Sequence, residues 1–200
     1  MATGLFAQPK SDMQIPRNII KFSPQHLIRG GLWMSGEFLN KDLKRSHQIS
    51  VETMYRQPNN DYGITKGIGI TAEYMFKYYL SKFHIEKSIT GMQTVNGYYV
   101  GVFGQYGYFD ETSRYLNRNN VESMNQVTTT VMYPGFVIGF QKSLGESFYA
   151  DFYAGAGMRI TDYSVKNETD GFSYRQSPGA YFIYNSGLLP KIGMSLGFGF

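Results

Sequence analysis

Side-chain character alternates from one residue to the next along several stretches of this chain, which is the period of a β-strand. In residues 67–80 the even positions read Ile, Ile, Ala, Tyr, Phe, Tyr and Leu, whereas the odd positions are mainly small, polar or charged. Successive side chains of a strand point to opposite faces of a sheet, so this stretch predicts a strand with one apolar face. Residues 28–38, 48–56, 148–161 and 191–200 repeat the pattern and predict four more strands.

Three further segments alternate less regularly. Residues 98–109 and 131–141 place Tyr, Phe, Ile and Val mostly on one face and Gly and Gln on the other, and residues 14–22 have the weakest pattern. Pro134 lacks the N–H that a central strand needs, so we expect a bulge or a strand end near it. The chain therefore holds eight predicted strands, without a helical period, an internal repeat or a linker.

The charged residues of these strands mark the polar face. Four strands carry two charges each, and in every case both lie on the face opposite the large apolar side chains: Arg29 and Glu37, Glu52 and Arg56, Glu73 and Lys77, Asp151 and Arg159. Independent placement would put the two charges of a strand on the same face in all four strands about one time in sixteen.

Two kinds of fold contain alternating strands of this type. In a water-soluble sandwich or lipocalin-like barrel the apolar face points inward, and charges follow the outer face of many strands. Here the polar face is rich in Gly, Ser and Tyr, while the apolar face carries no charge and ends in Tyr and Phe. That combination is typical of a lipid-facing band with aromatic girdles. We predict an all-β fold: an eight-stranded antiparallel up-and-down transmembrane β-barrel formed by residues 13–200.

Composition excludes several other classes. The chain has no cysteine, and its three histidines (His26, His47 and His84) are scattered, so we expect no disulfide, metal site or cofactor. The net charge of +4 comes without a basic run longer than "KDLKR", so nucleic acid is not an expected partner. No window approaches the roughly twenty apolar residues of a membrane-spanning helix.

The links between the predicted strands differ in length, which predicts an orientation. The links at "KDLKR" and "KSLGE" are short, whereas residues 111–126 and 166–186 form long polar segments at the opposite end. Outer-membrane barrels have short periplasmic turns and longer extracellular loops. Both ends of the chain are then expected in the periplasm, although the link of residues 81–94 is long for that side.

The first eight residues, "MATGLFAQ", end in a stretch similar to the tail of a secretory signal peptide cleaved before Gln8. An accidental likeness is the alternative, because a basic start and a full apolar region are absent from these residues. We assign residues 1–12 to this tail and an N-terminal extension.

Several motifs resemble those of one known group. They are "RNIIKFSP", "SGEFL", "AEYMFKYYLSK" with the following "GYYVGVFGQYGY", "FYADFYAGAGMR" and "KIGMSLGFGF". From about residue 18 onward the chain resembles the small outer-membrane β-barrel proteins of Bacteroidota, a domain-of-unknown-function group with the eight-stranded architecture of OmpA and OmpX. It departs from the group at Phe38, where a polar residue is usual, and in a longer insert before Gly97. The resemblance implies the fold and an outer-membrane location, and it implies no established activity.

The last strand also resembles the terminal aromatic signal that the barrel-assembly machinery reads, with Phe198 and Phe200 as the signal residues. The resemblance therefore implies this machinery as a partner during insertion. Outer-membrane lipid and lipopolysaccharide are the other expected partners.

An eight-stranded barrel is only wide enough for its own side chains. The inward positions predict a lumen charge network formed by Arg29, Glu37, Glu52, Arg56, Glu73, Lys77, Asp151, Arg159 and Lys191. Opposite charges nearly balance, so mutual hydrogen bonds offset the cost of burying them. Tyr79, Tyr149 and Tyr153 are expected to fill the remaining space, and the barrel is expected not to conduct ions.

Catalytic arrangements are weak in this sequence. His26 near Ser23 and His47 near Ser46 are the candidates for hydrolytic chemistry, and neither has an acidic residue at a telling position. We assign no catalytic residue and expect a non-enzymatic outer-membrane barrel, a structural or accessory subunit of a larger complex for secretion, uptake or barrel assembly. The alternatives are a lipid-modifying enzyme and a surface adhesin that acts through long extracellular loops.

Overall fold

The structure is a computed structural model that describes residues 17–56, 64–80, 96–116, 122–145, 147–167, 173–174 and 186–200. This part of the chain is all-β, which confirms the predicted class. Eight long antiparallel strands lie in one sheet: β1 (Asn18–Phe22), β2 (Gly31–Leu39), β3 (Arg45–Arg56), β4 (Ile64–Tyr79), β5 (Gly97–Leu116), β6 (Glu122–Ser143), β7 (Phe148–Asn167) and β9 (Gly187–Gly199). A two-residue strand, β8 (Ser173–Tyr174), pairs with the end of β7, and a single 3₁₀ helix, η1 (Pro24–Arg29), joins β1 to β2 in the described residues.

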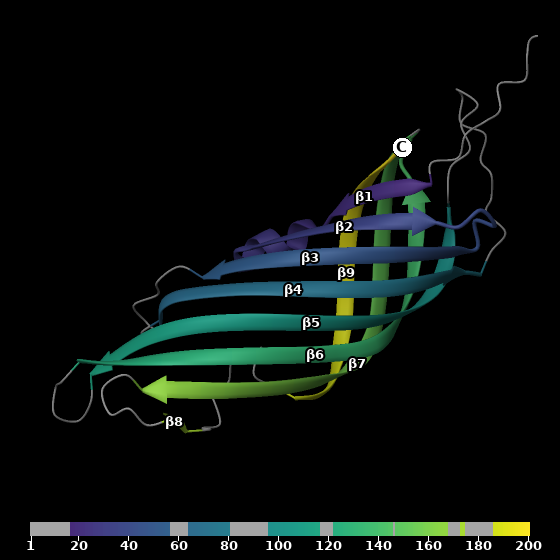
Figure 1. Ribbon diagram of the computed structural model, residues 1–200. Helices are drawn as coiled ribbons and strands as arrows, with labels where there is room; N and C mark the ends of the chain where they lie inside the picture. The colour runs from purple at the N-terminus through teal and green to yellow at the C-terminus, as the bar shows by residue number, and fades with distance from the viewer. Residues whose placement is uncertain are drawn as a thin grey trace, which may run out of the picture.

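The long strands follow one another around the sheet in chain order. Each pairs with the strand before it and the strand after it from β1 to β7, and β9 pairs with both β7 and β1. Figure 1 shows β2 to β6 as one wall with β9 and the start of β7 crossing behind it. Because the pairing returns to its starting strand, each of these eight strands has a hydrogen-bonded neighbour on both sides over at least part of its described length.

The closed sheet has an inner and an outer face that alternate along each strand. In β2 the odd-numbered residues from Gly31 to Leu39 are buried or nearly so, whereas Leu32, Met34 and Phe38 are 44%, 49% and 49% exposed. The inner face is the one on which the sequence places its charges. Between those charges the interior holds an apolar and aromatic cluster of Ile19, Leu39, Met75, Tyr79, Tyr99, Phe103, Phe109, Val131, Tyr133, Val137, Tyr149 and Tyr153.

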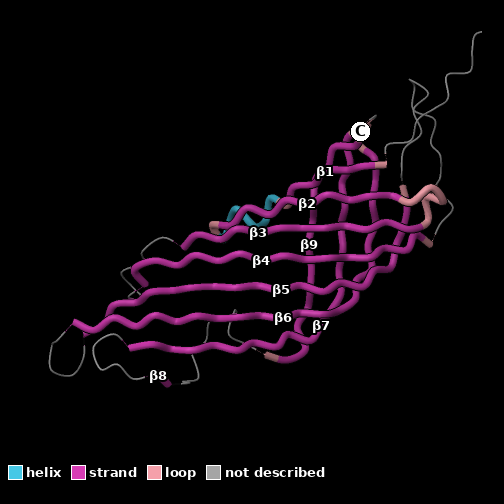
Figure 2. The backbone as a smooth tube through the Cα atoms, viewed as in Figure 1, coloured by secondary structure: helices cyan, strands magenta, loops and turns pink. Residues whose placement is uncertain are grey.

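We call the two ends of the sheet the turn end and the far end. The turn end carries the short links at residues 40–44 and 144–147, and there Phe200 donates its backbone N–H to the Asn18 carbonyl at 3.0 Å. In the first link Leu43 has a positive φ of 54°, and the Lys44 N–H and the Arg45 side chain bind the Asp42 carboxylate and lower its pKa. Figure 2 shows these links as pink loops at one end and η1 in cyan toward the other.

The predicted strand of residues 28–38 begins three residues late. Its first two residues belong to η1, which is followed by Gly30 as the capping residue in the left-handed conformation (φ 72°). A Cβ at this position would lie 2.6 Å from the Tyr55 carbonyl oxygen, so glycine is required both for the turn and for the close approach. The sequence predicted a strand there because Ile28 and Gly30 continue the even-numbered apolar and small residues of β2, although they lie in the helix and its cap.

Two other expectations about strand ends were wrong. Pro134 lies inside β6, where the register to β7 is the same on either side of it and only Tyr133 and Pro134 lack a partner in that ladder. Residues 111–126, expected as a long loop, instead belong largely to β5 and β6, which pair from Leu116 and Glu122 onward. Figure 1 shows β5, β6 and β7 reaching beyond β2 and β3 at the far end. The predicted signal tail, the link of residues 81–94 and most of residues 168–185 lie outside the described residues.

Inner glycines leave room for tyrosine rings from neighbouring strands. A Cβ on Gly139 would overlap the ring of Tyr99, and a Cβ on Gly193 would overlap the ring of Tyr153. Both rings therefore lie flat over a glycine of the adjacent strand, which is how an eight-stranded sheet accommodates large side chains inside.

We predict that Gly139→Ala displaces the Tyr99 ring and lowers the free energy of unfolding by about 1–3 kcal/mol, the usual cost of overpacking. Gly104→Ala on β5 is the matched control, because no atom lies within 4 Å of the added methyl group, and its effect should stay below about 0.5 kcal/mol. Urea titration of the two purified variants measures both values. Equal losses would show that the glycines are not required by the rings.

Candidate functional site: the charged interior

The structure places seven of the nine predicted interior charges on the inner face. Glu37, Glu52, Glu73, Lys77 and Asp151 are buried, and Arg159 and Lys191 are half-buried. The other two are placed by their backbone alone, since their side chains lie outside the described part: Arg29 ends η1 instead of lying on a strand, and Arg56 is the last residue of β3. Six of the seven fall into three separate groups, and the guanidinium carbon of the seventh, Arg159, lies 5.4 Å from the ring centre of Tyr133.

The first group is a four-charge cluster formed by Lys21, Glu37, Lys77 and Asp151 near the turn end. Lys21 forms ion pairs with Glu37 and, at 2.5 Å, with Asp151. Lys77 lies 2.7 Å from Asp151 and 3.3 Å from the same Glu37 oxygen. All four side chains are at most 1% exposed, so two ammonium groups and two carboxylates neutralise one another without help from water.

Hydroxyl and amide groups complete the four-charge cluster. Ser46 and Tyr79 donate to one Glu37 oxygen at 2.5 and 2.8 Å, and Tyr99 donates to Asp151 at 2.7 Å. Lys21 also donates to the side-chain oxygen of Gln141 at 2.7 Å. Together with the charges, these groups come from every strand from β1 to β7.

Burial of these four charged side chains is tolerated only when all four are present together. Two like charges or one unpaired charge in this interior would cost several kcal/mol, whereas alternating, hydrogen-bonded charges offset most of that penalty. The four-charge cluster therefore holds the strands in one register, because a shift of one residue would turn a cluster member to the outer face.

The second group is Glu73 with Lys191. Their side chains meet at 2.5 Å, and Lys191 also donates to Gln105 at 3.4 Å. Aromatic rings surround the ammonium group: its nitrogen lies 4.2 Å from the ring centre of Phe103 and 5.7 Å from those of Trp33 and Tyr133.

The third group joins η1 to β3. His26 Nδ1 lies 2.5 Å from a Glu52 oxygen, and the imidazole stacks on Trp33 with ring centres 4.7 Å apart. His26 therefore does have an acidic partner, contrary to the expectation from the sequence. Ser46 and His47 do not face each other, since Ser46 donates inward to Glu37 while His47, on the outer face, lies 2.7 Å from the Tyr74 hydroxyl.

The remaining predicted residues are placed as follows. Tyr79, Tyr149 and Tyr153 are buried inside the sheet at 2%, 1% and 9% exposure. Phe198 and Phe200 lie on the outer face at the turn end, 48% and 62% exposed, and the Phe198 ring meets that of Phe148 edge to face at 5.5 Å.

Sequence reasoning missed Lys21 and Gln141. Lys21 is in the five-residue strand β1, which has a single charge and so cannot show the paired pattern of the other strands. A signal was present nonetheless, because Ile20 and Phe22 flank Lys21 and point the opposite way. Gln141 likewise lies between two outward residues, Phe140 and Lys142. Its amide is uncharged, so it could not be recognised by pairing charges.

No set of three or more His, Cys, Asp or Glu side chains suited to a metal ion occurs within the described ranges. Among those same residues, no helix has the length and apolarity needed to cross a membrane. No family model, no curated protein and no solved structure matches this chain. Its class is therefore defined by its own geometry: an all-β chain in one closed antiparallel sheet with ion pairs inside.

We predict that Lys21→Met destabilises the protein by about 3–5 kcal/mol, because it leaves two buried carboxylates with a single ammonium group, that of Lys77. Lys142→Met is the matched control on the exposed face of β6 and should change the free energy of unfolding by less than about 0.5 kcal/mol. Adding Glu37→Gln to Lys21→Met should recover part of the loss, which a double-mutant cycle in urea measures. Strictly additive losses would mean that the two side chains do not interact.

Proposed function

We propose that this protein is an integral outer-membrane β-barrel, a structural or accessory subunit that presents a lipid-facing wall to a larger membrane complex. One observation carries the proposal: in the middle of the strands the described charges are all inside, and large apolar side chains cover the outside. A water-soluble sheet has the reverse arrangement, and soluble monomers rarely expose continuous apolar patches beyond a few hundred Å².

The outer face forms an uncharged band bounded by charges. Charged outward side chains border this band on both sides. They are Lys66, Asp110, Asp162 and Lys166 toward the far end and Arg45 and Lys142 at the turn end. Between these two sets no described outward position carries Asp, Glu, Lys or Arg. The members include Ile49, Ile70, Val102, Ile138, Phe152, Ile160 and Ile192, each about half exposed or more.

The height of this band fits a bilayer. On β5 the uncharged outward positions run from Tyr98 to Tyr108. At about 3.4 Å per residue and a strand tilt of about 40°, this stretch covers about 26 Å, close to the apolar band of outer-membrane barrels.

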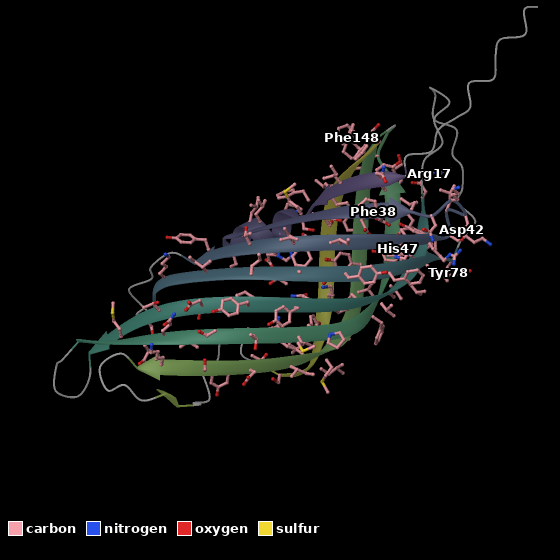
Figure 3. All side chains as sticks on the ribbon, viewed as in Figure 1. Arg17, Phe38, Asp42, His47, Tyr78 and Phe148 are labelled. Atoms are coloured by element: carbon pink, nitrogen blue, oxygen red, sulfur yellow. The ribbon has the colours of Figure 1, made fainter. Side chains whose placement is uncertain are left out.

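Aromatic side chains gather where the band ends. Figure 3 shows Phe38, His47, Tyr78 and Phe148 on the outer face of the turn end, beside Arg17 and Asp42. Toward the far end Tyr55, Tyr106 and Tyr108 are outward and 42–54% exposed. Rings at both borders of an apolar band support a membrane interface on each side.

A filled interior supports the accessory role. With its hydroxyl and amide partners, the four-charge cluster brings together side chains from seven strands near the turn end, and a barrel of eight strands is only wide enough for its own side chains. The surfaces left to act on other molecules are the lipid-facing wall and the far end. The short turns support a periplasmic turn end, because outer-membrane barrels have short turns on that side.

We predict that Val102→Arg lowers the stability of the protein in lipid by about 2–4 kcal/mol, because Val102 lies mid-band on β5. Leu144→Arg is the matched control: Leu144 is equally apolar and 62% exposed, against 59% for Val102, but it lies in a turn beyond the band. Urea unfolding from lipid vesicles compares the two variants. If Val102→Arg is as harmless as Leu144→Arg, the outer face is not in a membrane.

The accessory role has its own test. We predict that cross-linking in native membranes, mild solubilisation and affinity capture recover a larger membrane protein in stoichiometric amount. An unrelated tagged eight-stranded barrel in the same membrane is the control for non-specific capture. Recovery of a lone monomer under several gentle detergents would contradict the accessory role and leave the membrane proposal intact.

A further inference from the structure

A cavity of about 310 Å³ lies inside the sheet, beyond the four-charge cluster toward the far end. None of the four cluster residues lines it. Solvent reaches this part of the interior, because the His26 side chain, which belongs to the lining, is 18% exposed. The lining combines aromatic rings with polar and charged groups, and five of its members carry the argument: Trp33, Glu52, Gln105, Phe109 and Tyr153.

The charges around this cavity are of both signs, which argues against an ionic guest. His26 binds the Glu52 carboxylate at 2.5 Å, and Glu73 binds the Lys191 ammonium group at 2.5 Å. Arg159 is the other cation of the lining. An anion would meet the carboxylate of Glu52, and a cation would meet Lys191 and Arg159. The guest that this lining suits is therefore uncharged.

Three lining side chains have hydrogen-bonding groups that no described residue uses. His26 binds one Glu52 oxygen, and the other oxygen has no partner in the described part of the chain. Gln105 accepts from Lys191 at 3.4 Å, while its amide nitrogen donates to none of the described residues. The Tyr153 hydroxyl likewise has no hydrogen-bond partner among them. The lining thus offers an acceptor, a donor and a hydroxyl that can serve as either.

Two aromatic rings of the lining turn a flat face to the interior. A Cβ on Gly69 of β4 would lie 2.3 Å from the Phe109 ring, and a Cβ on Gly193 of β9 would lie 2.2 Å from the Tyr153 ring. Each ring therefore has one face against an inner glycine of the neighbouring strand, which leaves its opposite face toward the interior. A guest with a flat apolar face and a polar edge would match these rings and the unused polar groups.

We propose that this cavity binds a single neutral sugar ring. A pyranose has a face of C–H groups that packs on an aromatic ring, and its edge carries hydroxyls that both donate and accept. These hydroxyls would donate to Glu52, accept from Gln105 and form a further hydrogen bond with Tyr153. The volume is at the lower limit of small-molecule sites, which suits one ring and not an oligosaccharide. The inference does not rest on the membrane location.

Trp33 reports binding at this place, because it is the only tryptophan in the chain and it lines the cavity. The probes are the methyl glycosides of glucose, galactose, mannose and N-acetylglucosamine. They are titrated into purified protein in lauryldimethylamine oxide, a detergent without a sugar head group. We expect at least one glycoside to shift the Trp33 emission saturably, with a Kd of about 1 mM or tighter. Cyclohexanol, a six-membered ring with a single hydroxyl, is the comparison and should give no saturable shift.

Tyr153→Phe removes one hydroxyl and keeps the ring over Gly193, so it should raise the Kd of the bound glycoside by about three- to tenfold. Gln105→Leu removes the amide donor and should raise the Kd by a similar factor. Tyr149→Phe is the matched control and should leave the Kd unchanged, because Tyr149 is a buried tyrosine of the same strand outside the cavity lining.

Circular dichroism checks the folding of each variant, and if Gln105→Leu does not fold, Tyr153→Phe alone decides. Three results would each overturn the proposal: no saturable shift with any of the four glycosides, an equal response to cyclohexanol, or an unchanged Kd in the folded lining variants.

Discussion

Lys21 reaches two carboxylates that are far from it in the chain, Glu37 on β2 and Asp151 on β7, and Lys77 of β4 reaches the same two. These contacts exist only when the sheet closes, because β1 must lie between β2 and β9 to bring Lys21 opposite β7. Closure in turn is favourable only if the charges meet, since each would otherwise be buried alone. Register, closure and burial of charge are therefore one coupled condition in this protein.

That condition leaves the apolar side chains on the outside. Ile138 and Val102 are 63% and 59% exposed while Glu37 and Lys77 are fully buried. In water, the exposed apolar side chains and the buried charges would both be unfavourable. In a bilayer, the apolar side chains contact lipid and the paired charges stay away from it. The interior is also asymmetric along its axis, with the four-charge cluster near the turn end and the cavity at Trp33 beyond it.

The faces of the strands were predictable because one physical rule governs every strand. Alternation from Ile68 to Leu80 defines both sides of β4, and Glu73 and Lys77 then have to be inside. The prediction failed where a helix interrupts the alternation: Gly30 caps η1 inside a stretch that the alternation predicts to be a strand. The ladder of β5 and β6 continues through polar residues because backbone hydrogen bonds do not depend on side-chain character. The contact between His26 and Glu52 joins residues 26 positions apart, and no spacing rule predicts it.

The central claim is that the outer face contacts lipid and the inner face does not. Since the chain has no cysteine, single cysteines at each position from Tyr98 to Tyr108 can carry a nitroxide in protein reconstituted into lipid vesicles. The account predicts that collision with oxygen alternates with a period of two, is greatest at outward positions near Val102, and exceeds collision with a water-soluble nickel complex there. Outward labels that meet the nickel complex as often as a label at Leu144 in the exposed turn would contradict it.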